Sequence, residues 1–348
     1  LRRVPAAEAR GPKFLLLGHL RYDADKGELW QGEAPLRLTG TEQALLKRLA
    51  DTPRQPVSRI ELIEDLGRNP GDEIGENSER AIDGKITRLR RKIEAARPDV
   101  VMIFDSHWFT TGYHLVDGAA RYTGSYISDE MPWYLHGVPY DYRGHPELAL
   151  AIEAVSREQG GYNRAINHPE LGKQYATINL VKHLRLEQAD IPVVTVSSCQ
   201  NCDWTHFLTS GEAIGEAVRR SDLKVVLLAS GALSHKFNAI DWTPNHPRIF
   251  HESNVSRPEN IASDKAAIAL MEQGRHDSVL ARWDDDYRKK PWEAVGAHYL
   301  QMLGAMGGAD CRAKGVALSA YENARGTGNV HMWFDGEETA EATAKVAA

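Results

Sequence analysis

The stretch Val100-Val101-Met102-Ile103-Phe104-Asp105-Ser106-His107-Trp108 decides the fold of this chain. It opens on apolar, mostly branched residues, a pattern typical of a strand that is buried on both faces. The apolar run stops at Asp105, so we expect the strand to end there and to deliver polar side chains to one edge of a sheet. Ligands of open α/β sheets bind outside the carboxyl ends of the strands. The stretch therefore predicts a functional site beside His107.

Apolar runs alternate with helical patterns in the rest of the chain after residue 98. Two further runs predict buried strands at residues 191–197 and 224–230. Amphipathic or small-residue patterns predict helices at residues 146–158, 211–220, 261–273, 277–283 and 292–306. Strands that alternate with helices predict an α/β domain, here a mixed sheet in an α/β/α arrangement over residues 99–348.

Residues 1–98 have a different pattern, typical of a small α+β domain. Short apolar strands separated by turns are predicted between residues 14 and 38. Three helices should follow, one capped by Thr39 or Thr41, one capped by Ser58, and one at about residues 78–96. A chain of 348 residues is long enough for two such domains.

The helix expected at residues 78–96 concentrates positive charge in a chain of net charge −6. Its apolar positions form one stripe, so its cations lie on the opposite side. A helix of this kind suits phosphate contacts and entry into the major groove of DNA, although an ordinary solvated face is the alternative. The candidate DNA-binding residues are Arg80, Lys85, Arg88, Arg91 and Lys92.

Composition limits the compartment and the role of the cysteines. No apolar run approaches the roughly 18 residues of a membrane span, and no signal-peptide pattern opens the chain. With three cysteines in total, we expect a reducing cytoplasm and no contact with a membrane. Cys199 and Cys202 have redox or zinc spacing, but no second pair completes a zinc site, so we expect two incidental thiols.

Three histidines and one glutamate are candidate site residues. His107 and His235 each lie just beyond a buried strand, His168 lies in a loop, and Glu293 begins a helix. Two histidines and a carboxylate form the facial triad of non-haem iron(II) oxygenases. Taken singly, each histidine could equally be a structural residue held by hydrogen bonds.

The N-terminal part, over about residues 12–98, resembles the winged-helix output domain of response regulators. Three segments carry the resemblance: Leu38-Thr39-Gly40-Thr41-Glu42-Gln43-Ala44-Leu45-Leu46, Val57-Ser58-Arg59-Ile60-Glu61-Leu62, and residues 80–93. The resemblance implies that the last helix is a recognition helix for duplex DNA. The wing of that family is a final hairpin, for which only residues 110–115 could stand here.

The C-terminal two-thirds, over about residues 99–335, resembles the class III extradiol ring-cleavage dioxygenases of the homoprotocatechuate type. The matching segments are residues 103–108, 126–132, 142–148, 228–235 and 326–328. The resemblance implies Fe(II) as cofactor, a catechol such as 3,4-dihydroxyphenylacetate and O2 as substrates, and a homo-oligomer. It implies that His107 and Glu293 are iron ligands, that His235 is the acid/base, and that His168 contacts the substrate.

One motif of that family is absent. The family begins with a strand carrying Thr-His-x-Pro, whose histidine is the other iron ligand, and the winged-helix pattern occupies that place here. We therefore expect a ring-cleavage pocket with weak or absent iron, unless His19, His114 or His298 completes the site. The alternatives are a DNA-binding transcriptional regulator whose C-terminal domain senses an aromatic ligand without catalysis, and a hybrid without activity.

Overall fold

The computed structural model describes residues 14–17, 20–23, 26–36, 38, 46–47, 50, 79–132, 135–171, 173–248 and 250–335. The chain divides into two compact units, residues 1–76 and 77–348. The helix expected at residues 78–96 is present and belongs to the second unit. The sequence resembles one family before about residue 98 and another after it. The domain boundary expected there rests on this change of pattern and stays a prediction.

The first unit contains the predicted strand meander. Its antiparallel sheet has the order β1-β2-β3-β4. The strands are β1 (Phe14–Leu17), β2 (Leu20–Asp23), β3 (Glu28–Gln31) and β4 (Ala34–Leu36). Tyr22 is fully buried and forms a small apolar cluster with Leu29 and Ala50. The helix expected after Ser58 lies outside the described residues.

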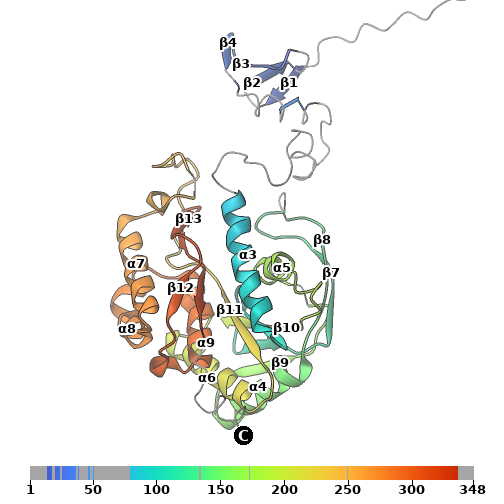
Figure 1. Ribbon diagram of the computed structural model, residues 1–348, viewed down its shortest axis with the longest axis vertical. Coiled ribbons are helices and arrows are strands. Elements are labelled where there is room, and N and C mark those ends of the chain that lie inside the picture. Colours follow the sequence, from blue (N-terminus) through green and yellow to red (C-terminus); the bar gives the residue numbers. More distant parts are fainter. Residues whose placement is uncertain are drawn as a thin grey trace, which may run out of the picture. The chain divides into compact units, whose positions relative to one another are not determined.

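The second unit is built on a five-stranded mixed sheet with the order β11-β5-β10-β6-β9 (Figure 1). The strands are β5 (Val100–Thr110), β6 (His114–Asp117), β9 (Asn163–Ile166), β10 (Val193–Cys199) and β11 (Val225–Ser230). β5 runs parallel to both of its neighbours, whereas β6 is antiparallel to β10. β11 closes one side of the sheet, and none of the described strands pairs with its outer edge.

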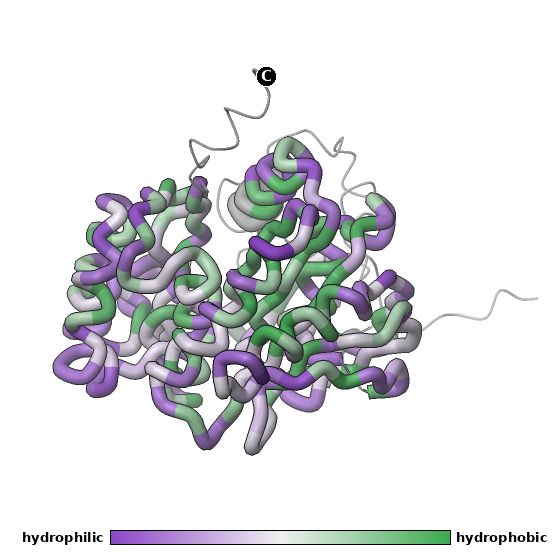
Figure 2. Tube along the Cα trace, turned by 90° about the horizontal axis from the view of Figure 1, so that it is seen from below, coloured by the Kyte–Doolittle hydropathy of each residue, from purple (hydrophilic) through white to green (hydrophobic). Residues whose placement is uncertain are grey.

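Helices cover both faces of this sheet, which confirms the α/β class. Successive side chains of a strand point to opposite faces. Accordingly, Met102 and Phe104 enter an apolar cluster with α4, α6 and α9, whereas Val101 and Ile103 enter another with α3 and α5. The helices are α3 (Glu79–Ala96), α4 (Pro146–Glu158), α5 (Tyr175–His183), α6 (Trp204–Arg219), α7 (Pro258–Glu272), α8 (His276–Ala281) and α9 (Ala297–Ala305). Hydrophobic segments run through the middle of this unit, and hydrophilic ones lie around it (Figure 2).

Three short antiparallel pairs complete the second unit. They are β7 (Arg121–Tyr126) with β8 (Val138–Arg143), β12 (Gly315–Ala317) with β15 (Met332–Phe334), and β13 (Glu322–Ala324) with β14 (Thr327–Asn329). No helix in the described part of the chain has the length and apolar character needed to span a membrane.

Two local expectations were wrong. The helix expected at residues 292–306 is broken, because Ala294 and Val295 have left-handed φ angles of 48° and 56°, so α9 begins only at Ala297. Residues 110–115 do not form a terminal wing hairpin, because β6 lies inside the five-stranded sheet between β10 and β9.

Candidate active site

A bulge in β5 creates the site. Phe104 pairs with Val196 and Phe109 with Ser198, so residues 105–108 leave the ladder with β10. We expected the strand to end at Asp105; it continues to Thr110, but its regular pairing is interrupted at the expected point. The polar residues that end the apolar run therefore project from the sheet.

The buried carboxylate of Asp105 holds this bulge. Its Oδ1 accepts hydrogen bonds from the backbone N–H groups of His107 and Trp108, at 2.8 and 3.1 Å. Its Oδ2 accepts from the backbone N–H and the hydroxyl of Thr177, at 3.1 and 2.6 Å. One side chain thus fixes the backbone around His107 and the first turn of α5 together.

His107 is the centre of a small polar cluster. Its Nε2 is 3.0 Å from Glu293 Oε1 and 2.8 Å from the hydroxyl oxygen of Tyr175. Its Nδ1 is 3.0 Å from Ser106 Oγ, which fixes the orientation of the ring. Burial, followed by the negative charge of Glu293, raises the pKa of Tyr175, so this phenol is protonated at neutral pH.

The segment after β11 brings Glu293 and His235 to the same place. Glu293 Oε2 accepts a hydrogen bond of 2.5 Å from the backbone N–H of Ala232. The backbone N–H of His235 donates to the carbonyl of Pro291 at 2.9 Å. As a result, His235 Nε2 lies 3.9 Å from Glu293 Oε1.

His298 is a buried neighbour of this cluster. Burial lowers its pKa to about 4, so the imidazole is neutral at neutral pH. Its ring packs on the end of β11 so closely that a Cβ atom added to Gly231 would lie 2.5 Å from Nδ1. Only glycine fits at position 231 without displacing this histidine.

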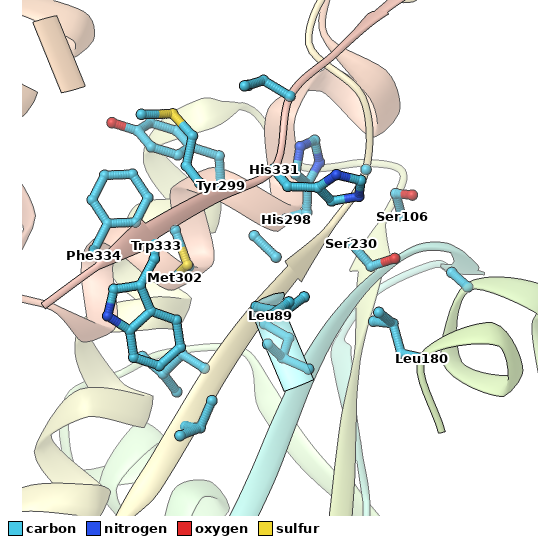
Figure 3. Close-up of a pocket in the computed structure, with 18 of the residues that line it drawn as sticks. Leu89, Ser106, Leu180, Ser230, His298, Tyr299, Met302, His331, Trp333 and Phe334 are labelled. Atoms are coloured by element: carbon cyan, nitrogen blue, oxygen red, sulfur yellow. The ribbon is translucent and has the colours of Figure 1, made fainter. Parts of the chain in front are cut away.

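The site opens into a cavity of about 850 Å³. Ser106, His107, Tyr175, Glu293 and His298 line one part of it, and the cavity continues along β11 to Met302, Trp333 and Phe334 (Figure 3). A volume of this size is within the range of small-molecule sites. The lining has a polar cluster beside an apolar wall, which suits an aromatic ring with polar substituents.

The other predicted site residues are less closely connected. His168 lies on an exposed loop, where its Nδ1 is 3.2 Å from Glu170 Oε2, and its role toward a substrate stays a prediction. Burial raises the pKa of the Cys202 thiol to about 12, which is the opposite of a reactive thiolate. His114 is buried in β6, with its Nε2 3.6 Å from Cys202 Sγ.

The candidate DNA-binding residues of α3 have different surroundings. Arg88 Nη1 donates to the carbonyl of Leu318 at 2.9 Å, and Lys92 Nζ lies 5.6 Å from the ring centre of Trp333. Arg91 is exposed. The structure does not describe the side chains of Arg80 and Lys85.

A two-histidine, one-carboxylate iron site is not formed by the residues that the structure describes. Among their histidines, cysteines, aspartates and glutamates, no three converge as metal ligands. His107 and Glu293 supply one imidazole and one carboxylate, and His235 is 0.9 Å farther from Glu293 Oε1 than His107 is, at 3.9 against 3.0 Å. His19 lies outside the described residues.

The family model for the catalytic LigB subunit of aromatic ring-opening dioxygenase matches residues 69–334. The chain belongs to this family. The match includes α3, in agreement with the packing of Leu89 and Ile93 on the sheet of the second unit. Membership supports an aromatic ring-cleaving dioxygenase.

Three relatives of this ring-opening dioxygenase homologue cover different shares of the chain. Protein PetR of Rhodobacter capsulatus is 55% identical over 95 residues, which are 27% of this chain and 40% of PetR. The 3,4-dihydroxyphenylacetate 2,3-dioxygenase of Escherichia coli is 29% identical over 72% of this chain and 93% of its own length. The beta subunit of 2-aminophenol 1,6-dioxygenase from a Pseudomonas species is 28% identical over 70% of this chain and 79% of that subunit.

Among solved structures, the uncharacterized protein JW3007 of Escherichia coli K12 matches with a TM-score of 0.49 and 16% identity. The alignment covers 76% of this chain and 95% of that one.

Proposed function

We propose that this chain is an extradiol dioxygenase that opens the ring of a catechol such as 3,4-dihydroxyphenylacetate with O2 and Fe(II). The observation that carries the proposal is the 3.0 Å approach of His107 Nε2 to Glu293 Oε1 beside a cavity of about 850 Å³. The likeness to the 3,4-dihydroxyphenylacetate 2,3-dioxygenase of Escherichia coli supports the substrate class.

His107 and Glu293 are the proposed metal ligands, and His235 is the proposed acid/base. His235 is 28% exposed and lies beside Glu293, so it can exchange a proton with a bound catechol and with solvent. His168 is proposed to contact substrate from its exposed loop. Since the second histidine of the family's site is missing from the described cluster, iron(II) should bind weakly and ring cleavage should be slow.

The test combines iron stoichiometry with a catechol cleavage assay that follows the yellow ring-opened product. We expect less than one iron per chain after gel filtration and activity that rises with added iron(II). His107→Ala and Glu293→Gln should abolish this activity, whereas His183→Ala and Glu259→Gln, at exposed positions, should leave it unchanged. Tight stoichiometric iron with rapid turnover would contradict weak binding, and no cleavage at any iron concentration would contradict the function.

A second candidate function is sequence-specific binding of duplex DNA by the N-terminal part. The 55% identity to PetR over 95 residues supports it, as does the strand meander of the first unit. In that case the ring-opening domain could act as a sensor of aromatic compounds in a transcriptional regulator. A catechol that changes DNA affinity without being cleaved would favour this function over the enzyme.

A further inference from the structure

Two side-chain oxygen atoms lie close to His107 Nε2. Glu293 Oε1 and Tyr175 Oη lie 3.0 and 2.8 Å from this one nitrogen. A neutral imidazole nitrogen either carries a hydrogen or accepts one, so Nε2 cannot donate to the Glu293 carboxylate and accept from the Tyr175 hydroxyl at the same time. The opposite nitrogen lies 3.0 Å from Ser106 Oγ. A flipped ring would lose this contact and place a carbon atom beside the two oxygen atoms, so the orientation given is the better one.

A metal ion would satisfy all three atoms. Ligands in six-coordinate sites of small divalent ions lie about 2.1 Å from the metal, so neighbouring ligands are roughly 3 Å apart. The two distances from His107 Nε2 have this size. We propose that Tyr175 Oη is a third protein ligand of a metal held by His107 and Glu293, and that it supplies the ligand which the family takes from its first-strand histidine. This inference rests on the metal site of the proposed function, but it does not require turnover.

The fold holds Tyr175 in place for this role. Tyr175 is the first residue of α5, and Thr177 in the same turn donates two hydrogen bonds to Asp105. The same carboxylate orders the backbone of His107. The rings of His107 and Tyr175 are therefore positioned by one buried group, with their centroids 4.2 Å apart.

Two other side chains with possible ligand atoms, Glu130 and His235, are farther from His107 Nε2 or Glu293 Oε1 than Tyr175 Oη is from His107 Nε2. Glu130 Oε1 lies 3.9 Å from His107 Nε2, and its side chain is 58% exposed. His235 Nε2 lies 3.9 Å from Glu293 Oε1. Of these three side chains, Tyr175 therefore comes closest to the pair. It stands 68 residues from His107, so the sequence alone does not reveal the contact.

A tyrosine ligand has a chemical signature that distinguishes it from histidine. When the phenol oxygen binds the metal, its proton leaves to solvent, so the site gains a second anionic ligand. Such a set favours iron(III) over iron(II). Phenolate bound to iron(III) also absorbs visible light by charge transfer, a colour that imidazole and carboxylate ligands do not produce.

The experiment uses the full chain, freed of metal with a chelator and titrated with iron(III) supplied as its nitrilotriacetate complex, without any catechol. We expect a visible absorption band that saturates at one iron per chain, with resonance Raman bands of a coordinated phenolate. Tyr175→Phe should lose the band and bind iron(III) at least about tenfold more weakly. Tyr162→Phe, which changes an exposed tyrosine, should keep both.

Tyr175→His provides a variant that retains a ligand. It should bind iron(II) more tightly than the unchanged chain and show no visible band. A band that persists in Tyr175→Phe, stoichiometric iron(III) without a band, or no binding of iron(III) at all would each overturn the inference. These outcomes are separate from failure of the proposed function, which is judged by catechol cleavage with iron(II).

Discussion

At the scale of single residues, Asp105 connects the site to the fold. Its carboxylate accepts four hydrogen bonds from two segments, although its side chain is completely buried. The sequence pointed to Asp105 because it ends the apolar run. It did not show that the carboxylate faces the backbone and α5 rather than a ligand, because that depends on how the bulge folds.

Asp105→Asn should destabilise the second unit. The amide nitrogen of asparagine cannot accept the hydrogen bonds of Thr177, and a buried group left without a partner costs about 1–3 kcal/mol. Urea unfolding should show this loss together with weaker metal binding. Asp241→Asn, at an exposed position, is the matched control and should change neither. An unchanged unfolding midpoint in Asp105→Asn would contradict the role given to this carboxylate.

His114 should make the stability of the second unit depend on pH. Burial lowers its pKa from 6.5 to about 4, so between these values the unfolded chain binds more protons than the folded one. The free energy of unfolding should therefore fall as the pH is lowered, by roughly 2 kcal/mol from this group between pH 7 and 5. Urea unfolding at several pH values tests this. His114→Gln should flatten the slope, and an equally steep slope in that variant would assign it to other groups.

At the scale of elements, α3 shows what a sequence pattern can and cannot predict. Its apolar stripe correctly predicted a helix with one buried face, and Leu89 and Ile93 lie in the core of the second unit. The pattern could not show that Arg88 and Lys92 contact residues 318 and 333 of the same unit. These contacts join residues more than 200 positions apart, beyond the reach of any local periodicity.

If α3 binds DNA, Arg91 should contribute more than Arg88, although both are exposed. Arg91→Ala should weaken binding of duplex DNA and reduce the salt dependence of the affinity by about one unit of slope, as expected for one lost phosphate contact. Arg88→Ala should affect DNA less, because Arg88 Nη1 already donates to Leu318. Fluorescence anisotropy at several salt concentrations measures both. Equal effects of the two changes would show that the contact with Leu318 is released on DNA.

The site itself was only partly predictable from sequence. His107, His235 and Glu293 were predicted as site residues because each follows an apolar run or begins a helical pattern. The structure brings these three side chains together, and their roles stay predictions. Tyr175 was missed, since it follows no strand and stands 68 residues from its partner. The left-handed turn at residues 294–296, which aims Glu293 inward, was also hidden in a stretch that has helical composition.

At the scale of the whole molecule, the join between the two sequence patterns lies inside a packed unit. The backbone N–H of Asp99 donates to the carbonyl of Lys224 at 2.8 Å, and the N–H of Lys224 donates to the Asp99 carboxylate at 2.7 Å. These hydrogen bonds hold residues 98–100 against the start of β11. The division into units falls at residue 76 instead.

Limited proteolysis should therefore cut at residues 67–77, or nearer the N-terminus, before it cuts at residues 98–100. Mass spectrometry of the first stable fragment should find an N-terminus before α3, and this fragment should keep a cooperative thermal transition. A stable first fragment that begins at residue 98–100 would show that α3 is dispensable for the ring-opening domain.

The outer edge of β11 has a consequence for how the protein behaves at high concentration. Its segment Val225-Val226-Leu227-Leu228-Ala229-Ser230 has no charge, and no strand of the described residues pairs with its outer edge. An open strand edge of this composition is a template for strands of other chains. We expect slow growth of β-rich aggregates, visible by light scattering and thioflavin fluorescence, at concentrations where the chain is still folded. Leu227→Lys should suppress it more than Leu150→Lys, which places the same charge on an exposed position of α4. The open outer edge of β11 would then shorten the time for which the folded protein can be stored at high concentration.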